Sequence, residues 1–557
     1  MALKNNYILS IVKALIGLVL LIVIGHYFHA RLDLTEDHRY TLSQPAINSV
    51  QDFNSPVFVD VLLKDNLPPE FARLKEETKQ LLEEFAAENK QIKFNFVNPL
   101  GEGQKTEAVI AELQALGLKP ASITVEDNGK TSQDILFPWA MVNYNNKTVK
   151  VALLKNKLGE TAEQRVNNSV QHLEYAFADA FTKLGLTDKK KVAVIKGNGE
   201  LDDLHIADFL TTIKDYYNIG AITLDSVATN PQKTLDQLEG YDLALIAKPT
   251  KPFTDAQKYV LDQYIVHGGK TVFLIDQVAI ELDSLFNEKG STLAFPRDLN
   301  LNDFFFKYGI RINPVLVNDL YFTQIVIANG EDSNTQYQPV PWYYNPMVFS
   351  RNNHPINTNL EAVRFQFANS IDTLANDNKK TILYWSSPLS KVVGTPEEIS
   401  LDLIKTPPKK KTYNNGNQPL AVLIEGQFQS AFKNRVKPIE LKNSLDQGPE
   451  NKMLVIADGD LIKNQVKNGR PLELGYDKWT NNFYGNKEFL VNSLNYLLDD
   501  TGLINIRNKK VSIPFLDQEK VVQQKVKWQW LNIGLPVVIC VIFGILYGYL
   551  RKRKYTS

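Results

Sequence analysis

The sequence predicts an α/β protein that is held in a membrane by one helix at each end. Two long apolar runs lie at residues 7–28 and 531–550. A bilayer core needs about 20 mostly apolar helical residues, and both runs reach that length. Between the runs, short apolar strands alternate with amphipathic helical segments, which is the pattern of α/β folds.

The first run, YILSIVKALIGLVLLIVIGHYF, carries a single charge at Lys13. Lys13 lies near the amino end, where its alkyl stem can follow the helix and bring the ammonium group to the lipid headgroups. The alternative is a cleaved signal peptide, which needs small residues before the cleavage point. Because bulky Phe28 stands in that position, we predict an uncleaved anchor over residues 1–30.

The second run follows Trp528 and Trp530 and ends at Arg551-Lys552-Arg553-Lys554. Tryptophans are typical of the membrane interface, and a basic cluster is typical of a cytoplasmic flank. The alternative is a buried helix of a soluble protein, which four cations rarely follow directly. With two spans both termini share the cytoplasmic side, so residues from about 30 to 529 are expected outside the cytoplasm.

Composition excludes several kinds of function. Lys plus Arg and Asp plus Glu both number 62, so no excess charge attracts nucleic acid or an anionic surface. The only cysteine is Cys540, inside the second run. An intramolecular disulfide, a cysteine nucleophile and a cysteine-ligated metal outside the membrane are therefore excluded.

A small α/β domain is predicted over residues 31–160. A strand from residue 56, a helix over 69–89 and a strand from residue 92 form a β-α-β unit. The outline is thioredoxin-like, but no Cys-x-x-Cys is present, so thioredoxin chemistry is excluded. The remaining expected elements are helices over 44–52 and 107–118, strands over 121–126, 135–144 and 147–154, and a helical linker over 161–188.

A larger α/β domain is predicted over residues 189–505, followed by a juxtamembrane segment, 506–530, the span and a basic tail, 551–557. Short apolar runs that begin at Lys191, Tyr241, Thr271 and Met453 alternate with helical segments, which indicates a parallel sheet covered on both faces. An insertion is expected at about 301–432. The other expected elements are helices over 203–218, 254–266 and 486–498 and strands from residues 381 and 420.

Polar residues follow four of the predicted strands. Ligands of open parallel sheets bind beyond the carboxyl ends of the strands, so neighbouring strands would bring these residues together. The alternative is that acidic residues at strand ends cap the next helix or fix loops. The strand end at Lys248 is one of the four, and the ligand-pocket candidates are Gly197, Asn198, Gly199, Glu200, His205, Asp276, Asp458 and Asp460.

Common phosphate, metal and nucleophile motifs are absent from the sequence. Gly268-Gly269-Lys270-Thr271 resembles the end of a phosphate-binding loop, but Tyr264 replaces the required first glycine. Asp202 replaces the third glycine of a dinucleotide fingerprint. The seven histidines lack metal-binding spacing, and no Gly-x-Ser-x-Gly elbow occurs. We therefore predict no cofactor, no metal and no enzyme activity.

The anchor followed by Arg31-x-Asp33-Leu34-Thr35 and Arg39-Tyr40-Thr41-Leu42-Ser43, with the later turn Gly197-Asn198-Gly199-Glu200, resembles a known family. This family is the auxiliary, substrate-binding-like subunit of gliding-motility ABC transporters, the GldG type, and the resemblance covers nearly the whole chain. It implies that the large domain is a GIFT domain, similar in fold to class I glutamine amidotransferases without their catalytic apparatus. Many members have Gly-His-Gly-Glu at the turn, so Asn198 argues against catalysis there.

The resemblance implies a location in the bacterial inner membrane with the bulk of the chain in the periplasm. It also implies a permease partner and, through it, a cytoplasmic ATPase, since this chain has no Walker motif. Permease docking is expected from the segment after the anchor, although the same segment could be a polar linker. The docking candidates are Arg31, Asp33, Thr35, Arg39 and Tyr40.

Two hypotheses of function remain open from the sequence. In the first, the chain is a non-enzymatic transporter component that couples the permease to cargo or to surface machinery. In the second, it is a glycan- or peptide-binding module, or a vestigial hydrolase, built around Glu200, His205, Asp276 and Asp458. Whether these four side chains converge distinguishes the hypotheses.

Overall fold

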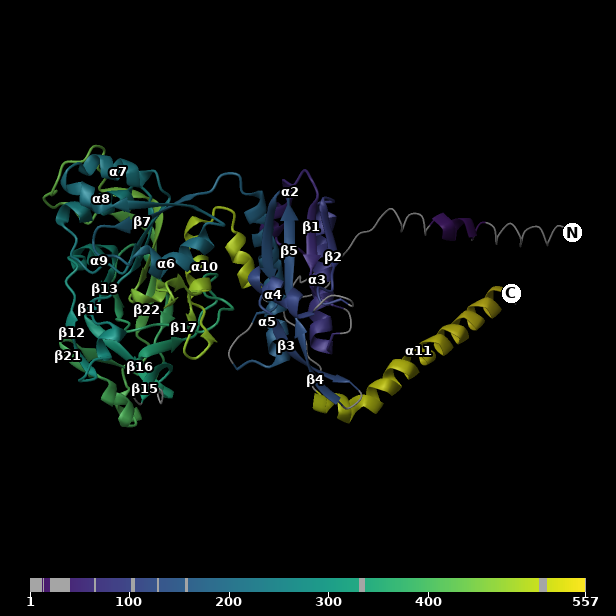
Figure 1. Ribbon diagram of the computed structural model, residues 1–557. Coiled ribbons are helices and arrows are strands. Elements are labelled where there is room, and N and C mark those ends of the chain that lie inside the picture. Colours follow the sequence, from purple (N-terminus) through teal and green to yellow (C-terminus); the bar gives the residue numbers. More distant parts are fainter. Residues whose placement is uncertain are drawn as a thin grey trace. The chain divides into compact units, whose positions relative to one another are not determined.

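The computed structural model describes most of the chain as a mixed α/β protein, which confirms the predicted class (Figure 1). It divides into two compact units, Met1–Lys509 and Lys510–Ser557. The docking candidates Arg31, Asp33, Thr35, Arg39 and Tyr40 lie outside the described residues. The described residues are Lys13, 15–20, 41–64, 67–101, 106–127, 130–155, 159–329, 336–509 and 518–555.

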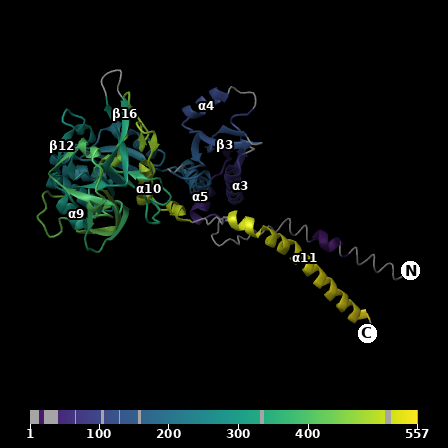
Figure 2. The same cartoon turned by 90° about the horizontal axis from the view of Figure 1, so that it is seen from below.

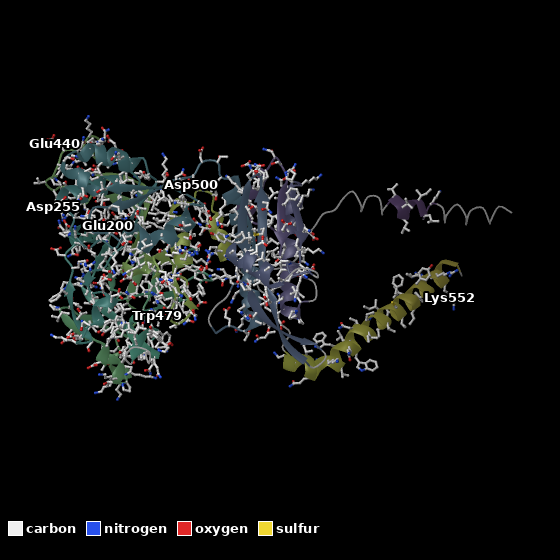
Figure 3. All side chains as sticks on the ribbon, in the orientation of Figure 1. Glu200, Asp255, Glu440, Trp479, Asp500 and Lys552 are labelled. Atoms are coloured by element: carbon white, nitrogen blue, oxygen red, sulfur yellow. The ribbon has the colours of Figure 1, made fainter. Side chains whose placement is uncertain are left out.

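The carboxyl-terminal unit contains one long helix, α11 (Gln518–Tyr555), which contains the predicted span (Figures 1 and 2). Within its stretch Gln523–Arg553, the most apolar 18-residue window has a mean hydropathy of 2.3, and none of that window is buried in the protein. Lys552 lies near the end of this helix (Figure 3). A helix that is apolar on all sides and exposed suits a membrane better than water, so α11 is a candidate membrane span.

The first predicted span lies mostly outside the described residues and stays a prediction. Its described part, Lys13 and residues 15–20, is helical, and the side chains of Leu15, Ile16 and Leu18 are exposed. Within the part of the chain that the structure describes, α11 is the one helix long and apolar enough to cross a membrane.

The amino-terminal unit begins with a four-stranded sheet in the order β2-β1-β5-β6. The central strand β1 pairs in parallel with β2 and antiparallel with β5, and β5 pairs antiparallel with β6. Val57, Val59 and Val61 of β1 are buried, because alternate residues of a strand point to the same face. The strands are β1 (Val57–Val61), β2 (Ile92–Phe96), β5 (Trp139–Tyr144) and β6 (Lys147–Ala152).

Three helices pack together beside this sheet: α2 (Gln44–Gln51), α3 (Pro69–Glu88) and α5 (Ala162–Gly185). Phe71, Leu74, Leu82 and Phe85 of α3 are buried at helical spacing, and Phe85 lies edge-on to Phe181 of α5 at 5.0 Å between ring centroids. Helix α5, predicted as a linker, therefore connects the first sheet to the strands that follow it, and it also packs against the first sheet and its helices.

The segment between β2 and β5 differs in part from the prediction. It forms helix α4 (Thr106–Ala115) and a separate hairpin of β3 (Ala121–Asp127) and β4 (Lys130–Leu136). Residues 135–144, predicted as one strand, are divided between β4 and β5 at Phe137-Pro138. Proline has no backbone N–H to donate to a ladder, so the strand is interrupted there.

A seven-stranded sheet in the order β19-β22-β23-β10-β9-β7-β8 forms the centre of the larger region. The five strands from β23 to β8 are parallel to one another, as predicted for all of them except β8. Strand β22 is antiparallel to β23, and β19 is antiparallel to β22. Residues 430–446, all described, contain no α-helix that could carry the chain across a face to a parallel position. The strands are β7 (Lys191–Lys196), β8 (Asn218–Thr223), β9 (Leu243–Ala247), β10 (Lys270–Leu274), β19 (Lys379–Trp385), β22 (Pro419–Gln429) and β23 (Gln447–Ile456).

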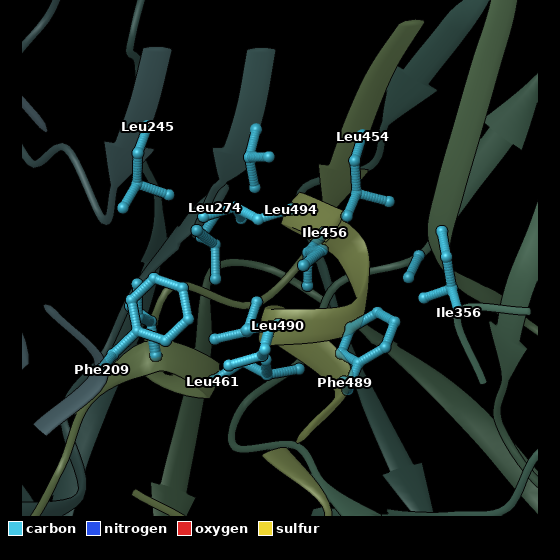
Figure 4. Packing of buried hydrophobic residues seen from close by; sticks show 14 of the residues in the cluster. Phe209, Leu245, Leu274, Ile356, Leu454, Ile456, Leu461, Phe489, Leu490 and Leu494 are labelled. Atoms are coloured by element: carbon cyan, nitrogen blue, oxygen red, sulfur yellow. The ribbon is translucent and has the colours of Figure 1, made fainter. Parts of the chain in front are cut away.

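Helices cover both faces of this sheet. On one face, Leu245, Leu274 and Leu454 of neighbouring strands pack in one cluster with Phe489 and Leu490 of α10 (Figure 4). Alternate strand residues form a second cluster with α7, α8 and α9 on the other face. One helix was predicted over residues 203–218. The structure instead has a shorter helix, α6, that ends at Ile213, and strand β8 begins at Asn218. The helices are α6 (Asp203–Ile213), α7 (Pro231–Glu239), α8 (Asp255–Val266), α9 (Asn302–Tyr308) and α10 (Asn486–Leu498).

The chain segments that follow β10 and β23 form small, separate antiparallel sheets. Most come from the predicted insertion, where Trp342, Tyr344 and Phe367 are buried in a core of their own. The strands are β11 (Val278–Ala279), β12 (Ser291–Pro296), β13 (Ile310–Ile312), β14 (Val315–Asp319), β15 (Phe322–Asn329), β16 (Gln336–Val348), β17 (Val363–Arg364), β18 (Ile371–Thr373), β20 (Ser390–Gly394), β21 (Glu397–Ser400), β24 (Val466–Lys467), β25 (Arg470–Pro471), β26 (Tyr476–Asp477) and β27 (Asn482–Phe483).

Candidate functional site

Four neighbouring strands, β23, β10, β9 and β7, supply the predicted candidate residues. Because these strands are adjacent and parallel, their carboxyl ends share one edge of the sheet. Asp458 follows β23, Asp276 follows β10 and Lys248 follows β9. The structure therefore brings three of the four predicted strand ends together around Lys248.

Lys248 is buried, and its ammonium group lies among three carboxylates. Its Nζ atom is 2.5 Å from Asp460 Oδ1, 2.8 Å from Glu281 Oε1 and 3.4 Å from Asp276 Oδ2. The residue has a left-handed backbone with φ of 55°. Residues other than glycine rarely adopt this backbone conformation. The Lys248 N–H donates to the Leu274 carbonyl at 2.9 Å, which fixes the backbone here.

The charges of this cluster are strongly coupled. Burial alone lowers the pKa of Lys248, but Asp276, Asp460 and Glu281 together raise it above its usual value. Burial raises the pKa of Asp276 to about 6, against the opposing effect of Lys248. Burial opposes ionisation of Asp460, yet Lys248 and Lys463 hold the pKa of that carboxyl below its usual value. Lys248 and Asp460 therefore form the ion pair at the centre of the cluster.

Asp276 and Asp458 mainly fix the loop after β23. Asp276 Oδ1 accepts from the Gly459 N–H at 2.5 Å. Asp458 accepts from the backbone N–H groups of Gln366 at 2.6 Å and of Asp460 at 2.8 Å. Burial raises the pKa of Asp458 well above its usual value, and the nearby Asp276 and Asp460 add to that effect. This arrangement favours a loop-fixing role for both residues.

The turn Gly197-Asn198-Gly199-Glu200 bonds to the loop after β9. The Asn198 carbonyl accepts from the Thr250 and Lys251 N–H groups, both at 2.9 Å, and its side chain donates to Gln257 Oε1 at 3.1 Å. Glu200 Oε2 accepts from the Asn198 N–H at 2.8 Å, and burial raises the pKa of Glu200. Gly197 and Gly199 both have positive φ values, 118° and 72°, which only glycine adopts readily. These bonds and backbone angles give the turn a structural role.

His205 lies in the first turn of α6, with Nδ1 at 2.8 Å from Asp202 Oδ1. In the described part of the chain, no hydrogen bond joins Glu200 or His205 to Asp276 or Asp458. Glu200 is not among the residues that line the cavity described next. The four residues of the hydrolase hypothesis therefore do not form one hydrogen-bonded constellation.

A cavity of about 520 Å³ opens beside the cluster, within the size range of small-molecule sites. Glu281, Asp460, Lys463 and His205 form one part of its lining. The other part consists of residues that the sequence did not indicate, among them Asn345, Tyr337, Gln366 and Trp479. Tyr337 and Asn345 lie on the long strand β16, and Gln366 and Trp479 lie in loops. No sequence rule selected them, because their place in the cavity depends on long-range contacts.

Within the described residues, no group of three or more His, Cys, Asp or Glu side chains is placed to hold a metal ion. The acidic residues around Lys248 are instead neutralised by Lys248 and Lys463. The arrangement can hold a loop rigid beside a cavity, and it offers no nucleophile paired with a base.

The geometry describes an α/β protein with a candidate membrane helix, a packed sheet and a cavity at its strand ends. Comparison with known proteins identifies its class. A family model described as an ABC-type uncharacterized transport system matches residues 189–493, which is more than half of the chain. The chain belongs to this family of auxiliary components of ABC-type transport systems. Association with a transporter complex follows from that membership.

Other comparisons add little about function. A domain of unknown function (DUF7088) matches residues 36–143. No curated protein matches the chain. Among solved structures, the chain is similar to one titled "mmIFT52 N-terminal domain", with 13% identity and a TM-score of 0.30, over 56% of this chain and 99% of that one. This likeness is too weak to indicate a shared function.

Proposed function

We propose that the protein is a non-enzymatic auxiliary subunit of a GldG-type ABC transporter complex associated with gliding motility. In this proposal residues 31–529 lie in the periplasm, and a helix at each end crosses the bacterial inner membrane. The observation that carries the proposal is the family match over residues 189–493, in a chain whose helix α11 is exposed and apolar.

The proposal includes an identity for each globular part. We infer that the first sheet is thioredoxin-like, which is supported by its order β2-β1-β5-β6 with one parallel and two antiparallel pairs. We infer that the seven-stranded sheet is the core of a GIFT domain, which is supported by its five parallel strands with helices on both faces.

A hydrogen-bonded contact supports coupling between the two chain ends. Lys509 Nζ donates to the Thr41 carbonyl at 2.8 Å and lies 2.7 Å from Glu174 Oε2, and Glu174 Oε1 accepts from the Ser43 N–H at 2.8 Å. Thr41 and Ser43 follow the predicted first anchor, and Lys509 precedes α11. We name Thr41, Ser43, Glu174 and Lys509 the terminal contact. A body whose two ends are joined follows movement at either anchor.

The proposed partners are a multi-span permease and, through it, a cytoplasmic ATPase. We infer that Arg31, Asp33, Thr35, Arg39 and Tyr40 dock on the permease or membrane surface, where Arg31 and Asp33 can form hydrogen-bonded ion pairs. The competing interpretation is a polar linker, which tolerates changes in length.

The two interpretations are tested by inserting a flexible Gly/Ser stretch between Ala30 and Arg31, and by Asp33→Ala. A docked segment loses permease co-purification and transport or motility in both variants at matched protein levels, whereas a linker tolerates both. Parent-like binding and function in both variants refutes docking.

The absence of enzyme activity is part of the proposal. It is supported by the loop-fixing bonds of Asp276 and Asp458 and by the lack of a hydrogen bond between them and Glu200 in the described residues. Glu200→Ala, Asp276→Ala and Asp458→Ala should each leave function largely intact wherever the protein still folds. Loss of function in all three, with unchanged expression and melting temperature, would instead indicate a working catalytic pocket.

A second candidate function, glycan or peptide binding at the strand-end crevice, is favoured by one specific observation. The cavity beside Lys248 and Asp460 has room for a small ligand and polar groups in its walls. This role is compatible with the first, because an auxiliary subunit can hold a ligand without transforming it.

A further inference from the structure

The cavity beside the Lys248 cluster has two exposed aromatic rings in its wall. Tyr337, on β16, is 62% exposed, and Trp479, which follows β26, is 51% exposed. Their ring centroids lie 5.4 Å apart at an interplanar angle of 31°. Large exposed apolar rings that gather at a cavity indicate a binding surface, because folding alone would bury them.

A buried amide also lines this cavity. Asn345, on β16, is 1% exposed, and its side-chain oxygen has no hydrogen-bond partner among the described residues. A buried polar atom without a partner costs about 1–3 kcal/mol, so such atoms are rare and call for an explanation. A ligand that donates a hydrogen bond inside the cavity provides one.

The charged residues of the lining are largely satisfied by one another. Lys463 lies 3.6 Å from Asp460 and 3.7 Å from Glu281, and Arg364 lies 3.7 Å from Asp477. A charged ligand would have to separate these pairs, which is costly at a partly buried site. An uncharged ligand leaves them intact.

We propose that this cavity binds an uncharged saccharide. The C–H face of a sugar ring suits the apolar face of an aromatic ring, while its hydroxyl groups both donate and accept hydrogen bonds. Tyr337 and Trp479 supply the aromatic surface, and Asn345 supplies the buried hydrogen-bonding group. The site does not depend on transporter membership, because binding is a property of the isolated chain.

The test uses the full chain purified in lauryldimethylamine oxide, since detergents with sugar headgroups would compete for the site. The probes are linear hexasaccharides of glucose, mannose or N-acetylglucosamine, with saturation-transfer NMR to detect binding and calorimetry to measure it. At least one probe is expected to bind. Tyr337→Ala and Asn345→Leu should each weaken it about tenfold, since each removes a principal contact.

Tyr321→Ala is the matched control, because Tyr321 is 49% exposed and does not line this cavity. It should bind the probe as the parent does. Asn345→Leu should melt at the parent temperature or above, because it replaces an unpartnered polar atom with an apolar group. This separates lost binding from lost folding.

The proposal is overturned if none of the three probes binds, or if Tyr337→Ala and Asn345→Leu both bind as tightly as the parent. It is also overturned if uncharged hexapeptides bind through the same residues while saccharides do not, since the cavity would then be a peptide site. None of these results bears on permease co-purification, so this proposal and the transporter proposal can fail separately.

Discussion

At the scale of single residues, the close approach of Gly459 to Lys248 decides whether the strand-end loop can form. A Cβ atom on Gly459 would lie 2.5 Å from Lys248 Cγ and 3.1 Å from Asp276 Cγ. Lys248 cannot move aside easily, because its ammonium group is held by three carboxylates. The position therefore requires glycine for space.

Gly459→Ala should lower the free energy of unfolding by about 1–3 kcal/mol, the usual cost of overpacking. Urea denaturation of the solubilised protein, followed by tryptophan fluorescence, measures this change. Gly394→Ala is the control, because nothing lies within 4 Å of the Cβ position there. Equal stability of the Gly459→Ala variant and the parent would contradict the described packing.

Asp276 should make stability depend on pH with a defined sign. Its folded pKa of about 6 is above the unfolded value, so the folded state binds more protons between about pH 4 and 6. The stabilisation that this proton provides is present at low pH and is lost as the pH rises through that window.

The comparison is with Asp276→Asn, which cannot ionise. The unfolding free energy of the parent minus that of the variant should fall by roughly 1–3 kcal/mol between about pH 4 and 6. Denaturant titrations at several pH values measure this difference. A difference that stays constant or rises with pH would show that Asp276 is ionised throughout.

The candidate residues show how far sequence reasoning reaches at this scale. Asp276, Asp458 and Asp460 could be predicted to converge, because parallel strands bring their carboxyl ends to one edge. The participation of Asn345 and Trp479 could not, because it depends on how the insertion and the loop after β26 fold over that edge. Local patterns contain no information on such long-range contacts.

At the scale of elements, helix α5 depends on a cap that the structure shows in full. The Thr161 hydroxyl accepts from the Gln164 N–H at 3.2 Å, and the Gln164 side chain accepts from the Thr161 N–H at 2.9 Å. This reciprocal pair is a capping box. By contrast, Ser43 stands at the N-cap of α2 without any side-chain cap bond.

Thr161→Ala should therefore cost about 0.5–2 kcal/mol of stability, the usual contribution of an N-cap side chain. Ser43→Ala is the matched control and should cost nothing, because the buried Ser43 hydroxyl has no partner among the described residues. Thermal and urea denaturation of both variants measure the effect. Equal losses in the two variants would show that the α5 cap contributes no specific stability.

Helix α11 should enter the membrane with its basic end in the cytoplasm. A cytoplasmic reporter fused after Ser557 should be active, and the same reporter inserted at residues 414–417 should be silent. Neutralising Arg551, Lys552, Arg553 and Lys554 should lower the active fraction, because positive flanks set orientation. Neutralising Lys525 and Lys527, on the opposite flank, should not lower it. An active reporter at residues 414–417 would overturn the proposed topology.

The elements also show which sequence signals are dependable. Long periodic segments such as α3 and α5 were predicted within a few residues, because burying one helix face imposes a repeat. Strand β8 was missed, because none of its residues is fully buried and Gly220 interrupts its apolar pattern. The two-residue strands β24 to β27 are set by tertiary contacts, so no periodicity could reveal them.

At the scale of the whole molecule, the terminal contact gives the described body a single point where its two ends meet. Glu174 of α5 accepts from the Ser43 N–H and pairs with Lys509, so residues 466 positions apart in sequence are joined through one carboxylate. A membrane anchor before Thr41 and one after Lys509 would both pull on the terminal contact. This arrangement is the physical basis of the proposed coupling to a permease.

The central claim, that the protein is a subunit of an ABC transporter complex, is tested most directly by isolating it from native membranes. The full chain, tagged after Ser557, is extracted in mild detergent and purified, and the bound proteins are identified and quantified by mass spectrometry. An unrelated tagged protein with one membrane helix is the control. The expected result is a multi-span permease and an ATPase with a Walker motif, both at a fixed ratio to the chain and absent from the control. Recovery of the chain without either protein, including after crosslinking in cells, would contradict the claim.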